Sequence, residues 1–195
     1  MINKKQLWML VGGNGSGKST FFEQFLKSLG IQFVNEDQIA KNISAKEPEN
    51  VSYQAARIAE NIRAAYLRSG LSFCFETVFS HPSKIDFMAE AKAFDYEIIM
   101  VFIHLDNNQL NQSRVNQRVS EGGHNVPSEK ITSRIPRTLA NVKKALPLAD
   151  MIYILNNSLK SDPYQRVATI KNGRLNLYIN PIPDWASVVL SDFDL

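Results

Sequence analysis

The chain of 195 residues has one cysteine, no long apolar run and little net charge. A single cysteine excludes an internal disulfide framework. Cys74 alternates with phenylalanines in LSFCFETVF, which favours packing in a buried strand over a nucleophilic role. No apolar run reaches the roughly 20 residues that cross a bilayer. The first residues, MINKKQLWML, lead directly into an apolar strand, so we expect no signal peptide. These features predict a soluble, cytoplasmic protein.

The charge balance and length narrow the class further. The 22 lysines and arginines exceed the 19 acidic residues by three, which suits an anionic small molecule but is too weak to indicate nucleic acid binding. The sequence also lacks internal repeats and low-complexity tracts. Its length suits one hydrophobic core, so we predict a single domain over residues 1–195.

The most specific motif follows the first apolar run. Residues 12–19 match the pattern G-x-x-x-x-G-K-[ST] in full, between a predicted strand at 7–11 and helical periodicity over 18–29. In this strand–turn–helix context, backbone N–H groups face the phosphates of a nucleoside triphosphate. We expect Lys18 to reach the β- and γ-phosphates and the Ser19 hydroxyl to bind Mg²⁺. The expected ATP-binding residues of this P-loop are Gly12, Gly13, Asn14, Gly15, Ser16, Gly17, Lys18, Ser19 and Thr20.

Strand and helix patterns alternate along the chain, which favours a parallel sheet with helices on both faces. The predicted strands are Leu7–Val11, Gln32–Asn35, Phe73–Glu76, Glu97–His104 and Met151–Leu155. The predicted fold is an α/β P-loop NTPase with a parallel five-stranded sheet, order 2-3-1-4-5, like that of nucleoside monophosphate kinases. After the fifth strand, two alternating runs flank Asn172-Gly173, the strongest short hairpin signal, so we expect a C-terminal β-hairpin over 166–179.

Other P-loop classes lack their markers here. A GTPase needs N-K-x-D after a strand, and Asn156-Asn157-Ser158 does not supply it. The segment 120–123 superficially matches an ABC signature, but no apolar strand ending in Asp-Glu follows. A motor ATPase needs a carboxylate that activates water. Asp106 is the nearest candidate, and it could equally cap the next helix.

Four segments together carry a family resemblance: GGNGSGKST at 12–20, NEDQIA at 35–40, FETVFSHPSK at 75–84 and RVSEGGHNVPSEKI at 118–131. They resemble the zeta-toxin/UDP-N-acetylglucosamine kinase family, and in particular its short members described as predicted ATPases. The resemblance extends from Leu7 to about Asn157. It implies phosphoryl transfer from ATP, with Mg²⁺, to a sugar hydroxyl of UDP-N-acetylglucosamine. It also implies a toxin whose partner is an antitoxin protein.

Asp37 is the predicted catalytic base. It follows the second strand, where a carboxylate can take the proton of an attacking hydroxyl, and the family has an aspartate with that role at the corresponding place. Two other interpretations stay open: Asp37 caps the following helix, or Glu36 is the functional carboxylate.

Further candidate residues surround the expected acceptor. Glu76 and Thr77 end the third strand and suit the acceptor or a metal-bound water, or they cap a helix. Glu60 matches a substrate-binding glutamate of the family, or it belongs to a solvated helix face. His81 closes over the acceptor, or it makes a turn with Pro82.

Arginines are expected to neutralise the transferring phosphoryl group. Arg114 and Arg118 lie one helical turn apart and so share a face. A lid over residues 118–137 would deliver Arg118 together with Arg134 or Arg137 on closure, and His124 in it could contact phosphate. Asn157 follows the last strand, where adenine rests in this fold.

Three functions remain open from the sequence. The first is the kinase, acting on UDP-N-acetylglucosamine, on another nucleotide sugar or on NAD. The second is a P-loop ATPase or nucleotide-dependent binding module. The third is a toxin defined mainly by its antitoxin. In none of them do we expect a nucleic acid or membrane partner.

Overall fold

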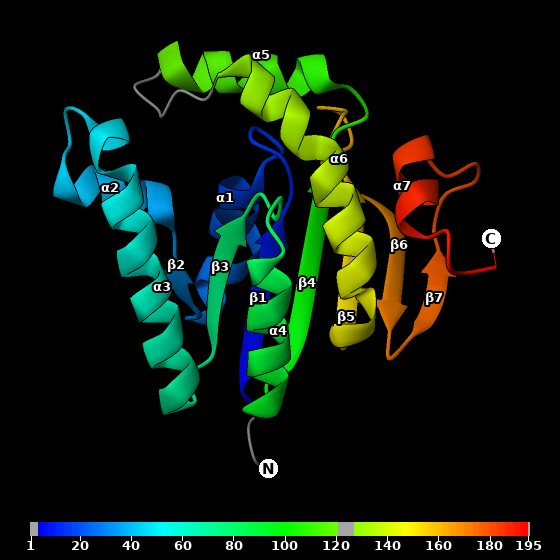
Figure 1. The fold of residues 1–195 in the computed structure, drawn as a ribbon. Coiled ribbons are helices and arrows are strands. Elements are labelled where there is room, and N and C mark those ends of the chain that lie inside the picture. The colour runs from blue at the N-terminus through cyan, green and yellow to red at the C-terminus, as the bar shows by residue number, and fades with distance from the viewer. Residues whose placement is uncertain (1–3, 121–126, 195) are drawn as a thin grey trace.

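In the computed structural model, residues 4–120 and 127–194 are described, with the backbone alone at 108 and 118–120. They form a seven-stranded mixed sheet in the order β2-β3-β1-β4-β5-β6-β7 (Figure 1). The strands are β1 (Gln6–Val11), β2 (Gln32–Val34), β3 (Phe73–Thr77), β4 (Glu97–His104), β5 (Met151–Asn156), β6 (Gln165–Lys171) and β7 (Arg174–Leu177).

The helices alternate with the parallel strands, as the sequence predicts. They are α1 (Lys18–Phe21), η1 (Phe22–Leu26), η2 (Lys27–Leu29), α2 (Glu36–Ile43), η3 (Pro48–Val51), α3 (Ser52–Ser69), α4 (Ser83–Ala93), α5 (Asn108–Ser120), α6 (Ser128–Ala145), η4 (Leu146–Leu148) and α7 (Asp184–Val189). The helix predicted over 18–29 is interrupted: its middle, η1, is a π-helix and its end, η2, is a 3₁₀-helix. Within the described residues no helix has both the length and the apolarity to span a membrane.

Alternation along the central strands builds two separate cores. In β1, Leu7, Met9 and Val11 face the larger core, which α3, α4, α6 and α7 complete. The intervening Trp8 and Leu10 face the smaller core, which the segment after the P-loop covers. This period of two is what a sheet buried on both faces requires. Because β1 pairs in parallel with both β3 and β4, the carboxyl ends of these three strands lie side by side.

The prediction of a sheet of five parallel strands, followed by a hairpin, is wrong in one respect. β2, β3, β1, β4 and β5 are parallel in the predicted order, but β6 pairs antiparallel with β5 and carries the sheet on to β7. The physical reason is burial: Val167, Ala168 and Ile170 of β6 are each at most 1% exposed and join the larger core. The hairpin therefore extends the main sheet.

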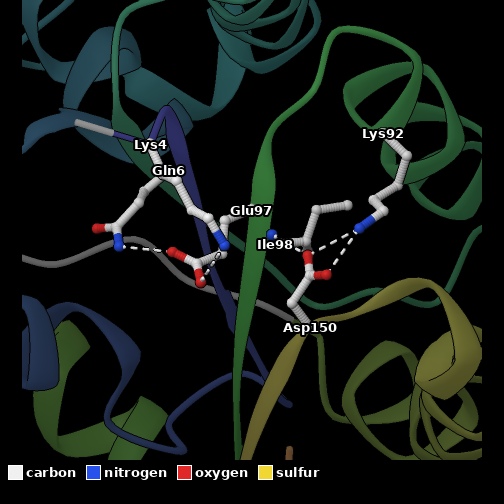
Figure 2. Close-up of polar contacts among 6 residues, drawn as sticks. All are labelled: Lys4, Gln6, Lys92, Glu97, Ile98 and Asp150. Carbon is white, nitrogen blue, oxygen red and sulfur yellow. Dashed lines mark hydrogen bonds and ion pairs between the residues drawn. The ribbon is translucent and has the colours of Figure 1, made fainter. Parts of the chain in front are cut away.

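Hydrogen bonds and ion pairs connect the amino ends of the parallel strands (Figure 2). Asp150, just before β5, accepts a hydrogen bond from the backbone N–H of Ile98 at 2.8 Å and from Lys92 Nζ of α4 at 2.7 Å. Burial would raise the pKa of Asp150, but these hydrogen bonds hold it below its usual value. At the start of β4, Glu97 accepts from Gln6 Nε2 at 2.9 Å. These contacts are structural, because they lie at the end of the sheet away from the P-loop.

Candidate functional site

A cleft of about 970 Å³ lies at the carboxyl end of the parallel strands, where the P-loop, α2, α3, α5 and α6 converge. Helix α5 crosses above these strand ends in Figure 1. Most of the predicted site residues line this one cleft: Asn14, Gly15, Gly17, Lys18, Ser19, Thr20, Asp37, Glu60, Glu76, Thr77, His81, Arg114, Arg134 and Asn157. The remaining P-loop residues, Gly12, Gly13 and Ser16, are buried within the loop.

The P-loop fits closely under α5. Gly15 has a φ of +75°, and a Cβ there would lie 2.7 Å from the backbone oxygen of Asn111. The Asn111 side chain in turn donates from Nδ2 to the backbone oxygen of Asn14 at 2.8 Å. Glycine is required where the chain is left-handed and a neighbouring backbone approaches this closely. Helix α5 thus holds the P-loop in this conformation.

Lys18 lies across the P-loop. It is 8% exposed, and its Nζ donates to the backbone oxygens of Gly12 and Gly13 at 3.0 Å each. The ammonium group is therefore held within the cradle that the loop forms.

Ser19 and Glu76 meet beside Lys18. Ser19 Oγ donates to Glu76 Oε2 at 2.7 Å, which joins the first turn of α1 to the end of β3. A hydroxyl and a carboxylate are the hard oxygen ligands that Mg²⁺ accepts together with nucleotide phosphates. The residues present therefore fit a magnesium ion at this point.

The first turn of α2 carries the acidic pair of the predicted acceptor site. The cap of this helix is Asn35, whose Oδ1 accepts from the N–H of Gln38 at 3.0 Å, so the interpretation of Asp37 as the cap is wrong. Glu36 Oε1 accepts from Arg63 Nη1 at 3.1 Å, which links α2 to α3. Asp37 lines the cleft beside Glu36.

Helix α3 presents one face to the cleft, and sequence reasoning missed most of it. Tyr53 and Arg57 line the cleft with the predicted Glu60, at spacings of four and three residues that put all three on one side of a helix. That spacing could have identified them. The side chain of Arg63, further along the face, is 4% exposed and packs its guanidinium 5.1 Å from the Phe75 ring centroid.

Lys84, at the start of α4, is another lining residue that the sequence did not single out. Burial lowers its pKa, the Arg63 guanidinium adds to this effect, and Glu36 and Glu60 oppose it. Next to it, exposed His81 accepts the N–H of Ser83 at Nδ1, 3.2 Å away. His81 therefore both makes a turn and lines the cleft.

The arginines divide between the cleft and the surface. Arg114 of α5 and Arg134 of α6 line the cleft. Arg137 is exposed and does not line it, because its Nε donates to the Ser133 backbone oxygen of the preceding turn at 3.2 Å. The prediction of Arg137 as a phosphate ligand is thus not supported by its position. The Arg118 side chain and His124 lie outside the described residues.

The predicted lid over 118–137 overlaps regular structure. Its described part belongs to α5 and to the first half of α6, where Ile131 and Ile135 are buried. Residues 128–137 therefore form a packed helix, and residues 121–126 lie outside the described part.

Asp106 has a structural position. Its carboxylate accepts from Trp185 Nε1 at 2.8 Å and from Asn156 Nδ2 at 3.1 Å, and Asn107 caps the turn into α5 instead. Burial would raise the pKa of Asp106, but the hydrogen bonds from Trp185 and Asn156 hold it below its usual value. Asp106 does not line the cleft, so the interpretations as a water-activating carboxylate and as a helix cap both fail.

The fold and this cleft together define a P-loop protein with a kinase-like α/β domain. Within that class, the chain belongs to the AAA-domain family, whose model matches residues 7–144. The match runs from β1 almost to the end of α6 and so includes the P-loop, Asp37 and Arg134. An uncharacterized protein of Haemophilus influenzae is 27% identical over 138 residues, which are 67% of this chain and 98% of that protein.

Solved structures share the fold. A chain of the AvrRxo1-ORF1:-ORF2 complex with ATP superposes with a TM-score of 0.73 and 18% identity, over 89% of this chain and 60% of that chain. A chain of the PezAT chromosomal toxin-antitoxin system of Streptococcus pneumoniae gives a TM-score of 0.67 and 12% identity, over 97% and 78%. The present chain thus spans about three fifths of the AvrRxo1 chain. At these identities the likeness shows the fold alone.

Proposed function

We propose that this protein is an ATP- and Mg²⁺-dependent kinase that transfers the γ-phosphate to a sugar hydroxyl of a nucleotide-containing small molecule. The observation that carries the proposal is the continuity of the cleft. The P-loop with Lys18 and Ser19 lines one part of it, and carboxylates from α2 and α3 line the other. A donor and an acceptor in that cleft would be in contact without leaving it, as in-line transfer requires.

The donor half contains the parts that a triphosphate needs. The P-loop N–H groups and the start of α1 would hold the phosphates, and Lys18 would exchange its loop carbonyls for phosphate oxygens. Magnesium held by Ser19, with Glu76 next to it, would neutralise charge between the β- and γ-phosphates. Arg114 and Arg134, and by prediction Arg118, would neutralise the transferring group.

The acceptor half provides the base. As the acceptor oxygen bonds to the γ-phosphorus, the bond to the bridging oxygen of ADP breaks and the hydroxyl proton passes to Asp37. Asp37 is the candidate of the acidic pair because it lines the cleft and matches the aspartate that has this role in the family that the sequence resembles. Glu60, Thr77 and His81 would contact the acceptor. UDP-N-acetylglucosamine is the acceptor that the resemblance implies.

The proposal includes a role as a zeta-type toxin restrained by an antitoxin protein. Its support is the resemblance, together with a fold shared with the PezAT toxin-antitoxin system. Arrest of growth by the expressed wild-type chain but not by its Asp37→Asn variant would support this role.

The test is a mass-spectrometric screen of the purified protein with ATP, Mg²⁺, pooled nucleotide sugars and NAD. We expect a product about 80 Da heavier than one component, the mass of a transferred phosphoryl group. Asp37→Asn should lower its formation about 10²- to 10⁴-fold, the usual contribution of a general base, while ATP still binds. Lys18→Ala should abolish it.

The other outcomes decide between alternatives. A heavier NAD would keep the reaction and replace the acceptor. Release of ADP without any heavier product, with Asp37 dispensable, would overturn the kinase in favour of an ATPase or a nucleotide-dependent binding module.

A further inference from the structure

The segment between β5 and β6, residues 157–164, makes side-chain contacts with the P-loop that the proposed reaction does not use. At its first residue, Asn157 Nδ2 donates to the Ser16 backbone oxygen at 2.8 Å. At its last, Tyr164 Oη donates to the Gly17 backbone oxygen at 2.9 Å. The two residues also join each other, because the Tyr164 N–H donates to Asn157 Oδ1 at 3.2 Å. Both ends of the segment are thus fixed to consecutive P-loop peptides.

These contacts are buried and geometrically demanding. Asn157 is 6% exposed, and its amide uses both its donor and its acceptor. Tyr164 has a φ of +57°, a strained conformation for a residue with a side chain, which persists only where the surroundings hold it. The rings of Phe21 and Phe25 do so, with centroids 5.3 and 5.7 Å from that of Tyr164. Burial also raises the pKa of Tyr164, so its hydroxyl remains a donor at neutral pH.

Gly17 shows how closely the segment approaches the loop. Its φ is +102°, and a Cβ at this position would lie 2.5 Å from Asn157 Nδ2 and 3.1 Å from Tyr164 Oη. Gly17 immediately precedes Lys18 and the first turn of α1. The peptides whose N–H groups would face the phosphates are therefore positioned by Asn157 and Tyr164.

The same segment lines the cleft beyond the P-loop. Leu159, Lys160, Pro163 and Tyr164 line it there. A nucleotide with its phosphates on the P-loop would have its base within reach of this wall.

We propose that Asn157 and Tyr164 are positioning residues that couple the base-facing wall of the cleft to the phosphate-binding loop. Because the Tyr164 hydroxyl holds the P-loop, it affects the binding of the phosphates and makes no contact with the base. The inference rests on one part of the proposed function, binding of a triphosphate at the P-loop, and is independent of the acceptor. It is therefore tested by binding, without any transfer reaction.

The experiment compares two ligands, Mg²⁺–ATP and Mg²⁺–tripolyphosphate, by isothermal titration calorimetry. Tyr164→Phe keeps the ring and removes the donor to Gly17. We expect it to weaken both ligands by the same factor, about three- to tenfold, as the loss of one hydrogen bond allows. Tyr178→Phe is the matched control, because it removes a tyrosine hydroxyl from a half-exposed residue outside the cleft.

A second variant tests the other contact. Asn157→Asp keeps an oxygen for the Tyr164 N–H but places a second oxygen against the Ser16 carbonyl, so we again expect equal losses for the two ligands. Thermal unfolding of each variant without ligand is measured alongside. A loss confined to ATP would mean that Tyr164 contacts the base directly and would overturn the proposal. Wild-type affinity of both variants for both ligands would overturn it as well.

Discussion

At the scale of single residues, His104 shows how the site end of the sheet responds to acid. It is 6% exposed at the end of β4, and its ring centroid lies 4.7 Å from that of Trp185. Burial lowers its pKa from 6.5 to about 4, although the Asp106 carboxylate opposes this shift. The unfolded chain therefore binds a proton below pH 6.5 that the folded chain binds only near pH 4. The free energy of unfolding therefore falls as the pH is lowered from 6.5 towards 4.

We predict that His104→Phe, which keeps an aromatic ring and cannot titrate, reduces this loss. Between pH 6.5 and 4.5 the free energy of unfolding should fall by about 2 kcal/mol less than in the wild type. Urea unfolding at a series of pH values measures it. The range ends above the region where the depressed pKa of Asp106 begins to matter.

Equal slopes for wild type and His104→Phe would contradict the assigned burial effect.

Single residues also mark the limit of sequence reasoning. The P-loop could be predicted because its pattern is contiguous in the sequence, although the close approaches to Gly15 and Gly17 come from distant residues. Arg63 could not, because a charged helix residue is normally solvated. Its burial depends on Glu36 and Phe75, from two other elements. Tyr164 gave no signal either, because its partner Gly17 lies 147 positions away and the intervening loop has no period.

At the scale of elements, α2 holds the proposed base in place through its cap. Asn35, 9% exposed, accepts the N–H of Gln38 and so fixes the turn that carries Asp37. Asn35→Ala should lower the free energy of unfolding by about 1 kcal/mol, the usual effect of losing such a cap. Chemical denaturation measures this value. Phosphoryl transfer should fall as well, because the first turn of α2 frays.

Asn61→Ala is the matched control for the cap, because it makes the same change at an exposed position inside α3. It should leave stability within about 0.5 kcal/mol of the wild type, with any change a gain, because alanine is the better helix former. If Asn35→Ala were as stable as this control, the cap would not hold α2.

Elements were also where prediction from the sequence worked best. Helices α3 and α6 have end signals that can be read locally, because Gly70 caps the end of α3 and Pro127 precedes the start of α6. The P-loop helix was predicted as one regular segment, and its interruption by η1 was not visible in the periodicity.

At the scale of the whole molecule, the order of the five parallel strands could be predicted, but the edge of the sheet could not. The turn at Asn172-Gly173 is encoded locally, with φ values of +49° and +76°. The choice of β5 as a neighbour depends on burying Val167 and Ile170 against residues far away in the sequence. A short stretch of sequence therefore does not indicate which strand β6 pairs with.

Because β6 and β7 are part of the main sheet, a change in the turn between them should affect the stability of the whole chain. Gly173→Val places a branched side chain in a left-handed conformation, at a cost of about 1–2 kcal/mol. Since β6 belongs to the main sheet, the whole chain should unfold in one transition with a midpoint a few degrees lower. Differential scanning calorimetry measures the shift.

Arg174→Val is the control, because it introduces the same side chain at the next exposed strand position. A wild-type midpoint for Gly173→Val, with faster amide exchange in β6 and β7 alone, would show that the hairpin behaves as an appendage.

The buried thiol of Cys74 provides a native probe of ligand binding. It is the sole cysteine of the chain, it is fully buried in β3, and burial raises its pKa, so a thiol reagent reaches it only when the sheet opens. A compound that binds the folded chain makes opening rarer and slows the modification in proportion to its occupancy. The rate of labelling at one native atom thus ranks nucleotides and sugar nucleotides as ligands, with no engineered probe and no assumption about the reaction.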